Sequence, residues 1–179
     1  EYGSLFGRTY RRYYGTKPED PIRIDEDQPL LIGANGFPVI DTKQKYLGST
    51  QPDYILSTLQ TVRYKQFSLT VLFDTRQGQM KYNQFGNFMS AFGTAKYTEN
   101  RTETMVFEGV LADGTPNTKP VYLGMGRGPD GVDYGNGFYR NVHRGVTENF
   151  VEDASWVRLR SLSLSYSWPG TILNKTKLI

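Results

Sequence analysis

Apolar and polar residues alternate along several stretches of the chain, a pattern typical of β-strands with two unlike faces. The clearest stretch is 67–77, where odd positions are mostly apolar or aromatic and even positions mostly polar. It follows the extended run 54–63 after a short turn, so the two runs are predicted to form a hairpin. A further alternating run covers 155–168, and its phase reverses near Arg160-Ser161. Either a β-bulge there or a strand that passes from one environment into another would explain the reversal.

The rest of the chain is interpreted around these runs. Residues 2–14 are predicted to form the first strand, and 15–53 an external loop, because several prolines interrupt it. Short strands around 21–24 and 30–32 are possible inside that loop. Residues 78–150 form a second long loop, with a short helix over 82–92 where aromatic residues recur every three or four positions. The expected fold class is all-β, with long strands at about 2–14, 54–63, 67–77 and 155–168.

Such alternation usually packs one strand face on a soluble core, but three features favour a large antiparallel transmembrane β-barrel. The strands are long enough to cross a membrane at a tilt. The connections alternate between a very short turn and long loops, as in outer-membrane barrels. Aromatic residues stand near the strand ends, where they would form the two membrane girdles: Tyr54, Tyr64, Phe67, Trp156, Tyr166 and Trp168.

Composition narrows the remaining function classes. The 179 residues are 37% hydrophobic and 14% aromatic, with a net charge of +3. No apolar run is long enough for a transmembrane helix, and no basic block indicates nucleic-acid binding. With no cysteine and a single histidine, His143, thiol chemistry and His-cluster zinc sites are excluded, and a Ser-His-Asp triad is disfavoured. On the barrel interpretation we predict no enzyme, no cofactor and no metal site.

Three motifs resemble the SusC/RagA type of TonB-dependent transporter, a family of the Bacteroidetes outer membrane. The first is the hairpin with Pro52-Asp53, Tyr64-Lys65-Gln66-Phe67-Ser68-Leu69 and Phe73-Asp74-Thr75-Arg76-Gln77-Gly78. The second is the loop sequence at 109–118 and the third is the strand sequence at 150–166. Their order agrees with the family over nearly the whole chain, although Gly78-Gln79-Met80 replaces the usual Gly-Gly-Asp.

The resemblance implies that residues 1–179 are a segment of a barrel of 22 strands, without the plug domain and closing strands. It implies TonB-dependent import of oligosaccharides or peptides across the bacterial outer membrane. The implied partners are a SusD-like surface lipoprotein, the TonB complex and outer-membrane lipid. The family motifs are architectural, so they assign no site residue.

Candidate contacts to substrate or partner come from the strands' polar face and from the second loop. They are Asp74, Arg76, Tyr82, Phe85, Tyr122, Tyr134 and Tyr139. We favour packing of the loop aromatics within the loop, and pairing of Asp74 and Arg76 with neighbouring strands or with the plug domain. His143 is expected to be an ordinary surface loop residue, and 130–136 lacks a complete calcium-loop pattern. The alternatives are a soluble β-sandwich, either a carbohydrate-binding module or a glycoside hydrolase domain with paired carboxylates.

Overall fold

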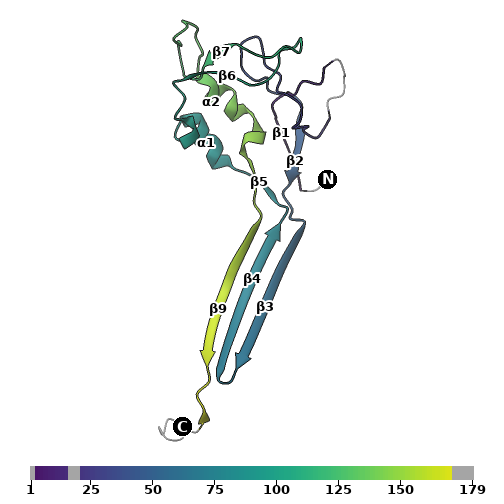
Figure 1. Ribbon diagram of the computed structural model, residues 1–179, viewed down its shortest axis with the longest axis vertical. Helices are drawn as coiled ribbons and strands as arrows, with labels where there is room; N and C mark the ends of the chain where they lie inside the picture. Colours follow the sequence, from purple (N-terminus) through teal and green to yellow (C-terminus); the bar gives the residue numbers. More distant parts are fainter. Residues whose placement is uncertain (1–2, 16–20, 171–179) are drawn as a thin grey trace. The chain divides into compact units, whose positions relative to one another are not determined.

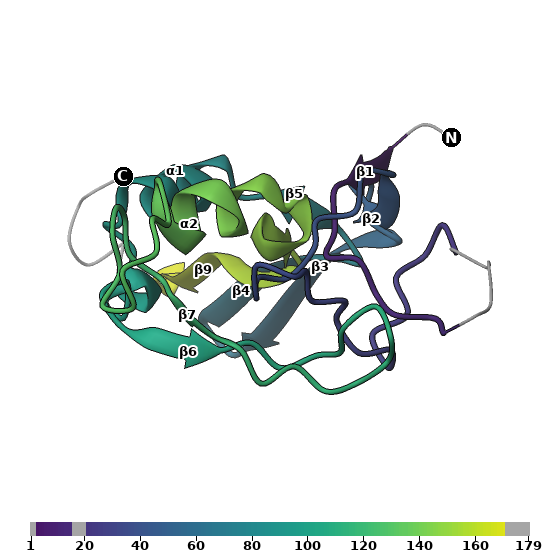
Figure 2. The same cartoon turned by 90° about the horizontal axis from the view of Figure 1, so that it is seen from above.

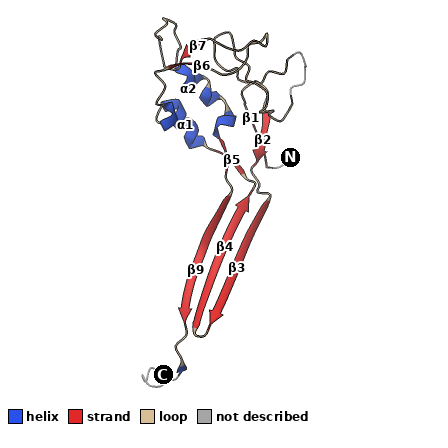
Figure 3. Ribbon diagram, viewed as in Figure 1, coloured by secondary structure: helices blue, strands red, loops and turns tan. Residues whose placement is uncertain are grey.

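The computed structural model describes residues 3–15 and 21–170, which divide into two compact units. We call them the sheet unit (51–79 and 153–170) and the loop unit (described residues of 1–50 and 80–152). The sheet unit contains a single three-stranded sheet, whereas the loop unit combines short strands with helices (Figures 1 and 3). None of the described helices is both long and apolar enough to cross a membrane.

The sheet unit consists of three long antiparallel strands in the order β3-β4-β9. These are β3 (Tyr54–Tyr64), β4 (Phe67–Gln77) and β9 (Trp156–Tyr166), each of 11 residues. The expected hairpin is therefore present, with a turn at Lys65 and Gln66 in which Lys65 takes the left-handed φ of 53°. At the other end of the hairpin, Gly78 has φ 78°, and a Cβ there would lie 2.0 Å from an Asp53 carboxylate oxygen. Only glycine fits that turn.

The register gives the sheet one apolar and one polar face, since directly opposed residues share a face. On the apolar face Val62 opposes Leu69, which opposes Leu164. Gln60 lies on this face too, opposite Val71, where its amide nitrogen donates to Thr58 Oγ1 at 2.9 Å. The other face carries mostly polar residues: Ser57, Thr61, Ser68, Thr70, Asp74, Arg76, Arg158, Ser161, Ser163 and Ser165, interrupted by Ile55, Leu59 and Leu72.

The predicted bulge is present at Arg160. Leu72 opposes Ser161 and Phe73 opposes Leu159, so Arg160 has no opposing residue on β4. This extra residue reverses the alternation along β9. Trp156 opposes Arg76 and lies on the polar face, whereas Tyr166 opposes Phe67 on the apolar face. Trp156 therefore does not share a face with the aromatic residues expected to form girdles with it.

The loop unit contains the remaining elements. Its strands are β1 (Ser4–Gly7), β2 (Lys45–Ser49), β5 (Met80–Tyr82), β6 (Thr104–Val106), β7 (Pro120–Tyr122) and β8 (Val151–Asp153), paired as β1-β2, β5-β8 and β6-β7. Its helices are α1 (Gln84–Phe92) and α2 (Gly137–Asn141), with single 3-10 turns η1 (Lys96–Thr98), η2 (His143–Gly145) and η3 (Thr147–Phe150). The predicted helix is thus confirmed as α1, capped by Asn83, whose Oδ1 accepts from Gly86 N at 2.7 Å.

The expected first strand at 2–14 is much shorter in the structure. Regular pairing covers only Ser4–Gly7, whose partner is β2, a strand that the sequence pattern did not predict. After Gly7 the backbone bonds to loop segments instead: Arg11 N donates to Val39 O, and Tyr13 N to Pro29 O. The strands considered around 21–24 and 30–32 occur only as isolated bridges at Arg23 and at 30–32.

The second loop, 78–150, has more internal structure than expected, because it supplies most of the apolar core of the loop unit. Helices α1 and α2 lie side by side in two views of the molecule (Figures 1 and 2). Apolar residues from the helices, from β7 and from the turns are buried in the loop unit: Ile32, Ala91, Ala95, Val121, Leu123, Phe138, Val146 and Phe150. Burial of this apolar surface supplies the main driving force for ordering a glycine-rich segment.

Candidate functional site

An acidic side chain organises the polar face of the sheet unit. Asp74 is only 4% exposed, and one carboxylate oxygen accepts from Ser57 Oγ at 2.8 Å. The other accepts from Arg160 Nη1 at 2.8 Å and lies 3.7 Å from Arg158 Nη2. The bulge aims Arg160 at this carboxylate, and the Arg158 guanidinium lies 4.9 Å from the Trp156 ring centroid.

Asp74 and Arg76 thus lie on one face of the sheet, as expected, but their side chains have different contacts. Asp74 is fully engaged with neighbouring strands, whereas Arg76 approaches Gln79, with 3.5 Å between Nη1 and Oε1. The buried Nε of Arg76 has no hydrogen-bond partner among the described residues. The Asp74 cluster, formed with Ser57, Arg158 and Arg160, links the three strands. Arg76 lies outside it and has fewer hydrogen bonds than its guanidinium could make.

A cavity of about 420 Å³ lies in the loop unit between α1, β7 and α2. We call it the α1–α2 cavity. Its aromatic lining residues include Phe92, Tyr122 and Tyr139, and its charged ones are Arg101 and Arg140. The remaining lining residues are small, polar or flexible: Ser90, Ala91, Gly93, Thr102, Leu123, Gly124, Met125 and Asn136.

The backbone next to this cavity is tightly packed. Gly137, with φ 76°, begins α2, and a Cβ there would lie 2.8 Å from the backbone of Gly124. Phe138 N donates to Leu123 O at 3.0 Å, which ties α2 to the end of β7. The Tyr139 hydroxyl donates to Tyr97 O at 2.9 Å and also contacts Asn100 Oδ1, and burial raises the pKa of Tyr139. The cavity wall is therefore largely preformed.

The other loop aromatics proposed as contacts are dispersed. Tyr82 packs edge-on against Phe150. Tyr134 donates its hydroxyl to Asp130 at 2.6 Å, and this hydrogen bond raises the pKa of Tyr134 and lowers that of Asp130. Phe85 is 74% exposed on the outer side of α1. Of the five loop residues proposed, only Tyr122 and Tyr139 line the α1–α2 cavity.

His143 is not the exposed loop residue that was expected. Its ring packs against four aromatic rings, those of Tyr97, Phe138, Tyr139 and Phe150. Its Nδ1 lies 2.9 Å from Ser90 Oγ, and burial lowers its pKa to about 4. The ring is therefore neutral at pH 7 and serves as part of the aromatic packing.

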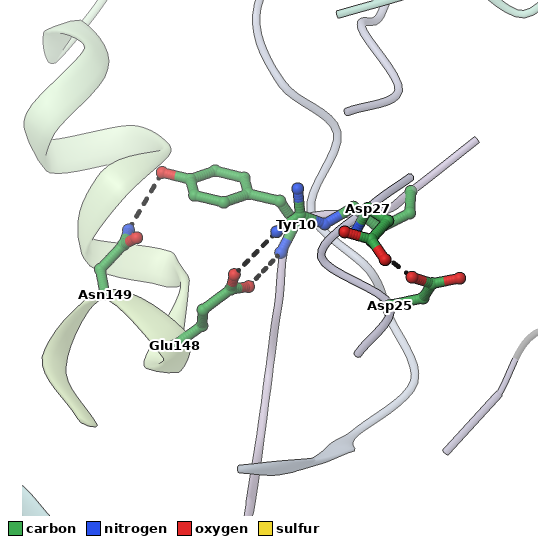
Figure 4. A network of polar contacts seen from close by, with 6 residues as sticks. Tyr10, Asp25, Asp27, Glu148 and Asn149 are labelled. Carbon is green, nitrogen blue, oxygen red and sulfur yellow. Dashed lines mark hydrogen bonds and ion pairs between the residues drawn. The ribbon is translucent and has the colours of Figure 1, made fainter. Parts of the chain in front are cut away.

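A polar network fastens the N-terminal segment to η3 (Figure 4). Glu148 accepts from Tyr10 N at 3.0 Å and from Arg12 Nη2 at 3.1 Å. Asn149 Nδ2 donates to the Tyr10 hydroxyl at 3.0 Å, and burial raises the pKa of Tyr10 to about 12. Glu148 N donates to Arg8 O at 3.2 Å, which extends the attachment. This network replaces the regular strand pairing expected for 2–14.

Most of the aromatic residues expected to form girdles lie on the apolar face of the sheet. Tyr54, Tyr64, Phe67 and Tyr166 lie on the apolar face, where Phe67 and Tyr166 are in contact with ring centroids 4.8 Å apart. Trp168 follows the end of β9 and packs edge-on against Tyr166 at 5.5 Å. Four aromatic residues thus mark the two ends of one exposed apolar face.

A comparison with curated proteins finds a receptor with a similar sequence. The chain is 26% identical over 183 aligned residues to TonB-dependent receptor P3 of Formosa agariphila. The chain is similar to a TonB-dependent receptor. The alignment covers 98% of this chain but only 16% of the relative, so the chain spans a small part of that receptor. No family model matches the sequence.

Sequence reasoning missed the two arginines of the α1–α2 cavity. Arg101 and Arg140 are far apart in the chain, and no motif surrounds either of them. Their proximity depends on how α1, β7 and α2 pack. The glycines at 124 and 137 were the available signal, since a close backbone approach requires such residues. Within the described ranges, no group of three or more His, Asp or Glu side chains is placed to hold a metal ion.

Proposed function

We propose that the chain is a segment of a TonB-dependent outer-membrane receptor that imports oligosaccharides or peptides. In this proposal β3, β4 and β9 cross the outer membrane as part of a large β-barrel, and Lys65 lies on the periplasmic side. The loops 15–53 and 78–150 lie outside the cell, where a SusD-like lipoprotein and the substrate would contact them. The TonB complex would act through other parts of the receptor.

The observation that carries the proposal is the exposed apolar face of the sheet unit. A membrane strand needs about 9–11 residues and an apolar outer face flanked by aromatic residues. The three strands have 11 residues each, with exposed leucines and valines between the aromatic ends. Water would penalise so much exposed apolar surface, whereas lipid would not. The similarity to a TonB-dependent receptor points the same way.

The Asp74 cluster fits the same environment. A charged side chain in a membrane strand must face the barrel interior and be paired. Asp74, Arg158 and Arg160 meet on the polar face, opposite the leucines and valines. The proposal assigns no catalytic residue, and it involves neither a cofactor nor nucleic acid.

Site-directed labelling tests the topology, because the chain contains no cysteine. Glu99→Cys and Lys65→Cys would be introduced separately into the intact receptor, both at exposed positions. A membrane-impermeant maleimide should label the Glu99→Cys receptor on whole cells, and the Lys65→Cys receptor only after the outer membrane is permeabilised.

The control is a receptor with neither substitution, which should acquire no label at these positions. Labelling of both variants on intact cells would contradict the topology. Recovery of the protein as a water-soluble monomer would instead favour the β-sandwich alternatives, because a β-sandwich domain folds in water without a membrane.

A further inference from the structure

We propose that the α1–α2 cavity binds an acidic saccharide, with Arg101 and Arg140 contacting its carboxylate or sulfate group. This inference rests on the proposed import function and names the substrate class for one site of the loop unit. All the lining residues belong to that unit and to its described part.

The cavity has the dimensions and composition of a ligand site. A volume of about 420 Å³ lies within the range of small-molecule pockets, which are mostly apolar with a few polar groups. Its floor is preformed by the packing of Gly137 against Gly124 and by the bond from Phe138 N to Leu123 O. A preformed wall lowers the entropic cost of binding.

The charge of the lining selects an anion. Arg101 and Arg140 line the cavity, and no aspartate or glutamate does. Arg101 uses Nη1 to donate to Gly93 O at 2.8 Å, which orients the guanidinium and leaves its other donors for a ligand. Arg140 is exposed and has no ion-pair partner within the described residues. Arginine binds carboxylate and sulfate well because its planar fork can donate two parallel hydrogen bonds.

The aromatic lining favours a saccharide over an acidic peptide. Phe92, 68% exposed, adjoins the cavity, and Tyr122 and Tyr139 line it. The face of an aromatic ring is electron-rich and packs well against the C–H face of a sugar ring. Asn136 and Thr102 add neutral donors and acceptors suited to hydroxyl groups. An extended peptide is usually held by main-chain hydrogen bonds along a strand edge, which is a different arrangement.

Calorimetry on the intact receptor in detergent tests the assignment. The probes are an oligogalacturonate, a sulfated galactan oligosaccharide, a neutral cello-oligosaccharide of equal length and an oligoglutamate peptide. We expect at least one acidic saccharide to bind and the neutral one to bind at least about 10-fold more weakly. Arg140→Gln and Arg101→Gln should each weaken acidic saccharide binding about 10-fold, and higher salt should weaken it further.

Arg127→Gln is the matched control. Arg127 is exposed and lies in the glycine-rich segment 124–137, but it does not line the cavity. Preference for the sulfated or the carboxylated probe identifies the anionic group, and either supports the proposal. Equal binding of the neutral saccharide, tighter binding of the peptide, no binding, or an equal effect of Arg127→Gln would overturn it. Arg140 has no ion-pair partner among the described residues, so Arg140→Gln separates binding from folding.

The failure of this site and the failure of the proposed function give different results. Cysteine labelling of positions 65 and 99 decides the membrane topology without any ligand. A receptor with the expected labelling that binds none of the acidic saccharides would lose only the cavity assignment.

Discussion

The two units of the chain bury different kinds of side chain. In the loop unit, Val121, Leu123 and Val146 are at most 1% exposed, as in a protein core. In the sheet unit, the buried residues are the polar Asp74 and Gln79, while leucines and valines of the strands are exposed. A unit that folds in water hides its apolar side chains. The comparison therefore teaches that, among the described residues, only the loop unit has an apolar core, and substitutions should separate the two units.

The largest effect is expected in the core of the loop unit. Phe138 is 7% exposed, and its ring centroid lies 4.7 Å from that of Phe107. Phe138→Ala should destabilise the unit by about 3–5 kcal/mol, because the truncation leaves a cavity. Phe85→Ala, at a residue 74% exposed, should cost less than about 0.5 kcal/mol. Hydrogen exchange of residues 120–150 in the intact receptor measures both, and similar losses of protection would contradict the contrast.

The next effect distinguishes the two faces of the sheet unit. Leu162 is 64% exposed on the apolar face, and the adjacent Ser163 lies on the polar face opposite Thr70. Leu162→Arg should destabilise the membrane-inserted receptor by about 2–4 kcal/mol, since a charge would face lipid. Ser163→Arg should be tolerated better. The readout is the fraction of receptor that resists urea and keeps its heat-modifiable mobility in detergent gels. Equal tolerance of both variants would mean that neither face contacts lipid.

A smaller effect is expected where the N-terminal segment meets η3. Glu148→Ala removes the acceptor of Tyr10 N and Arg12 Nη2 and leaves both donors without it. We expect a local loss of about 1–3 kcal/mol, seen as faster hydrogen exchange in residues 8–13. Glu99→Ala is the control, because Glu99 is exposed and lies outside this network. Unchanged exchange in the Glu148 variant would show that the network does not hold this segment.

The smallest effect is a pH dependence of the loop unit through His143. Its folded pKa of about 4 lies below the ordinary value of 6.5, so the unfolded state binds the proton more readily. The stabilisation is complete above pH 6.5 and is lost as the pH falls toward 4. Solvent screens this partly exposed ring and keeps the effect modest. His143→Gln should flatten the difference in exchange protection between pH 7 and pH 4.5, after correction for intrinsic rates. An unchanged difference would contradict the assignment.

The sheet unit was largely predictable because its signals are local. Alternation, the turn at Lys65 and the phase reversal at Arg160 can all be detected within a few neighbouring residues. The side of Trp156 required one more step, namely counting the bulge residue before assigning faces. The similarity to a TonB-dependent receptor agrees with the coarse part of the sequence interpretation and leaves partner and substrate as proposals.

The loop unit was less predictable because its order comes from distant contacts. Strand β2, the attachment of Tyr10 to Glu148 and the burial of His143 each depend on residues far away in the sequence. Helix α1 could be predicted from spacing, yet its aromatic side is exposed and the small residues Ser90 and Ala91 are buried. The α1–α2 cavity has no sequence signature, since packing alone brings Arg101 and Arg140 to it.

The bulge at Arg160 also determines which insertions and deletions the strand β9 can accept. Removing this residue would restore an unbroken alternation in the sequence. The faces of the other residues would not change, because Ser161 and Leu159 already oppose the adjacent Leu72 and Phe73. A regular ladder that kept Arg160 would instead move Val157 and Leu159 to the side of Asp74. A map of tolerated substitutions should therefore favour apolar residues at odd positions before 160 and at even positions after it. Arg160, which has no opposing residue on β4, thus determines on which face of the sheet the residues before it in β9 lie.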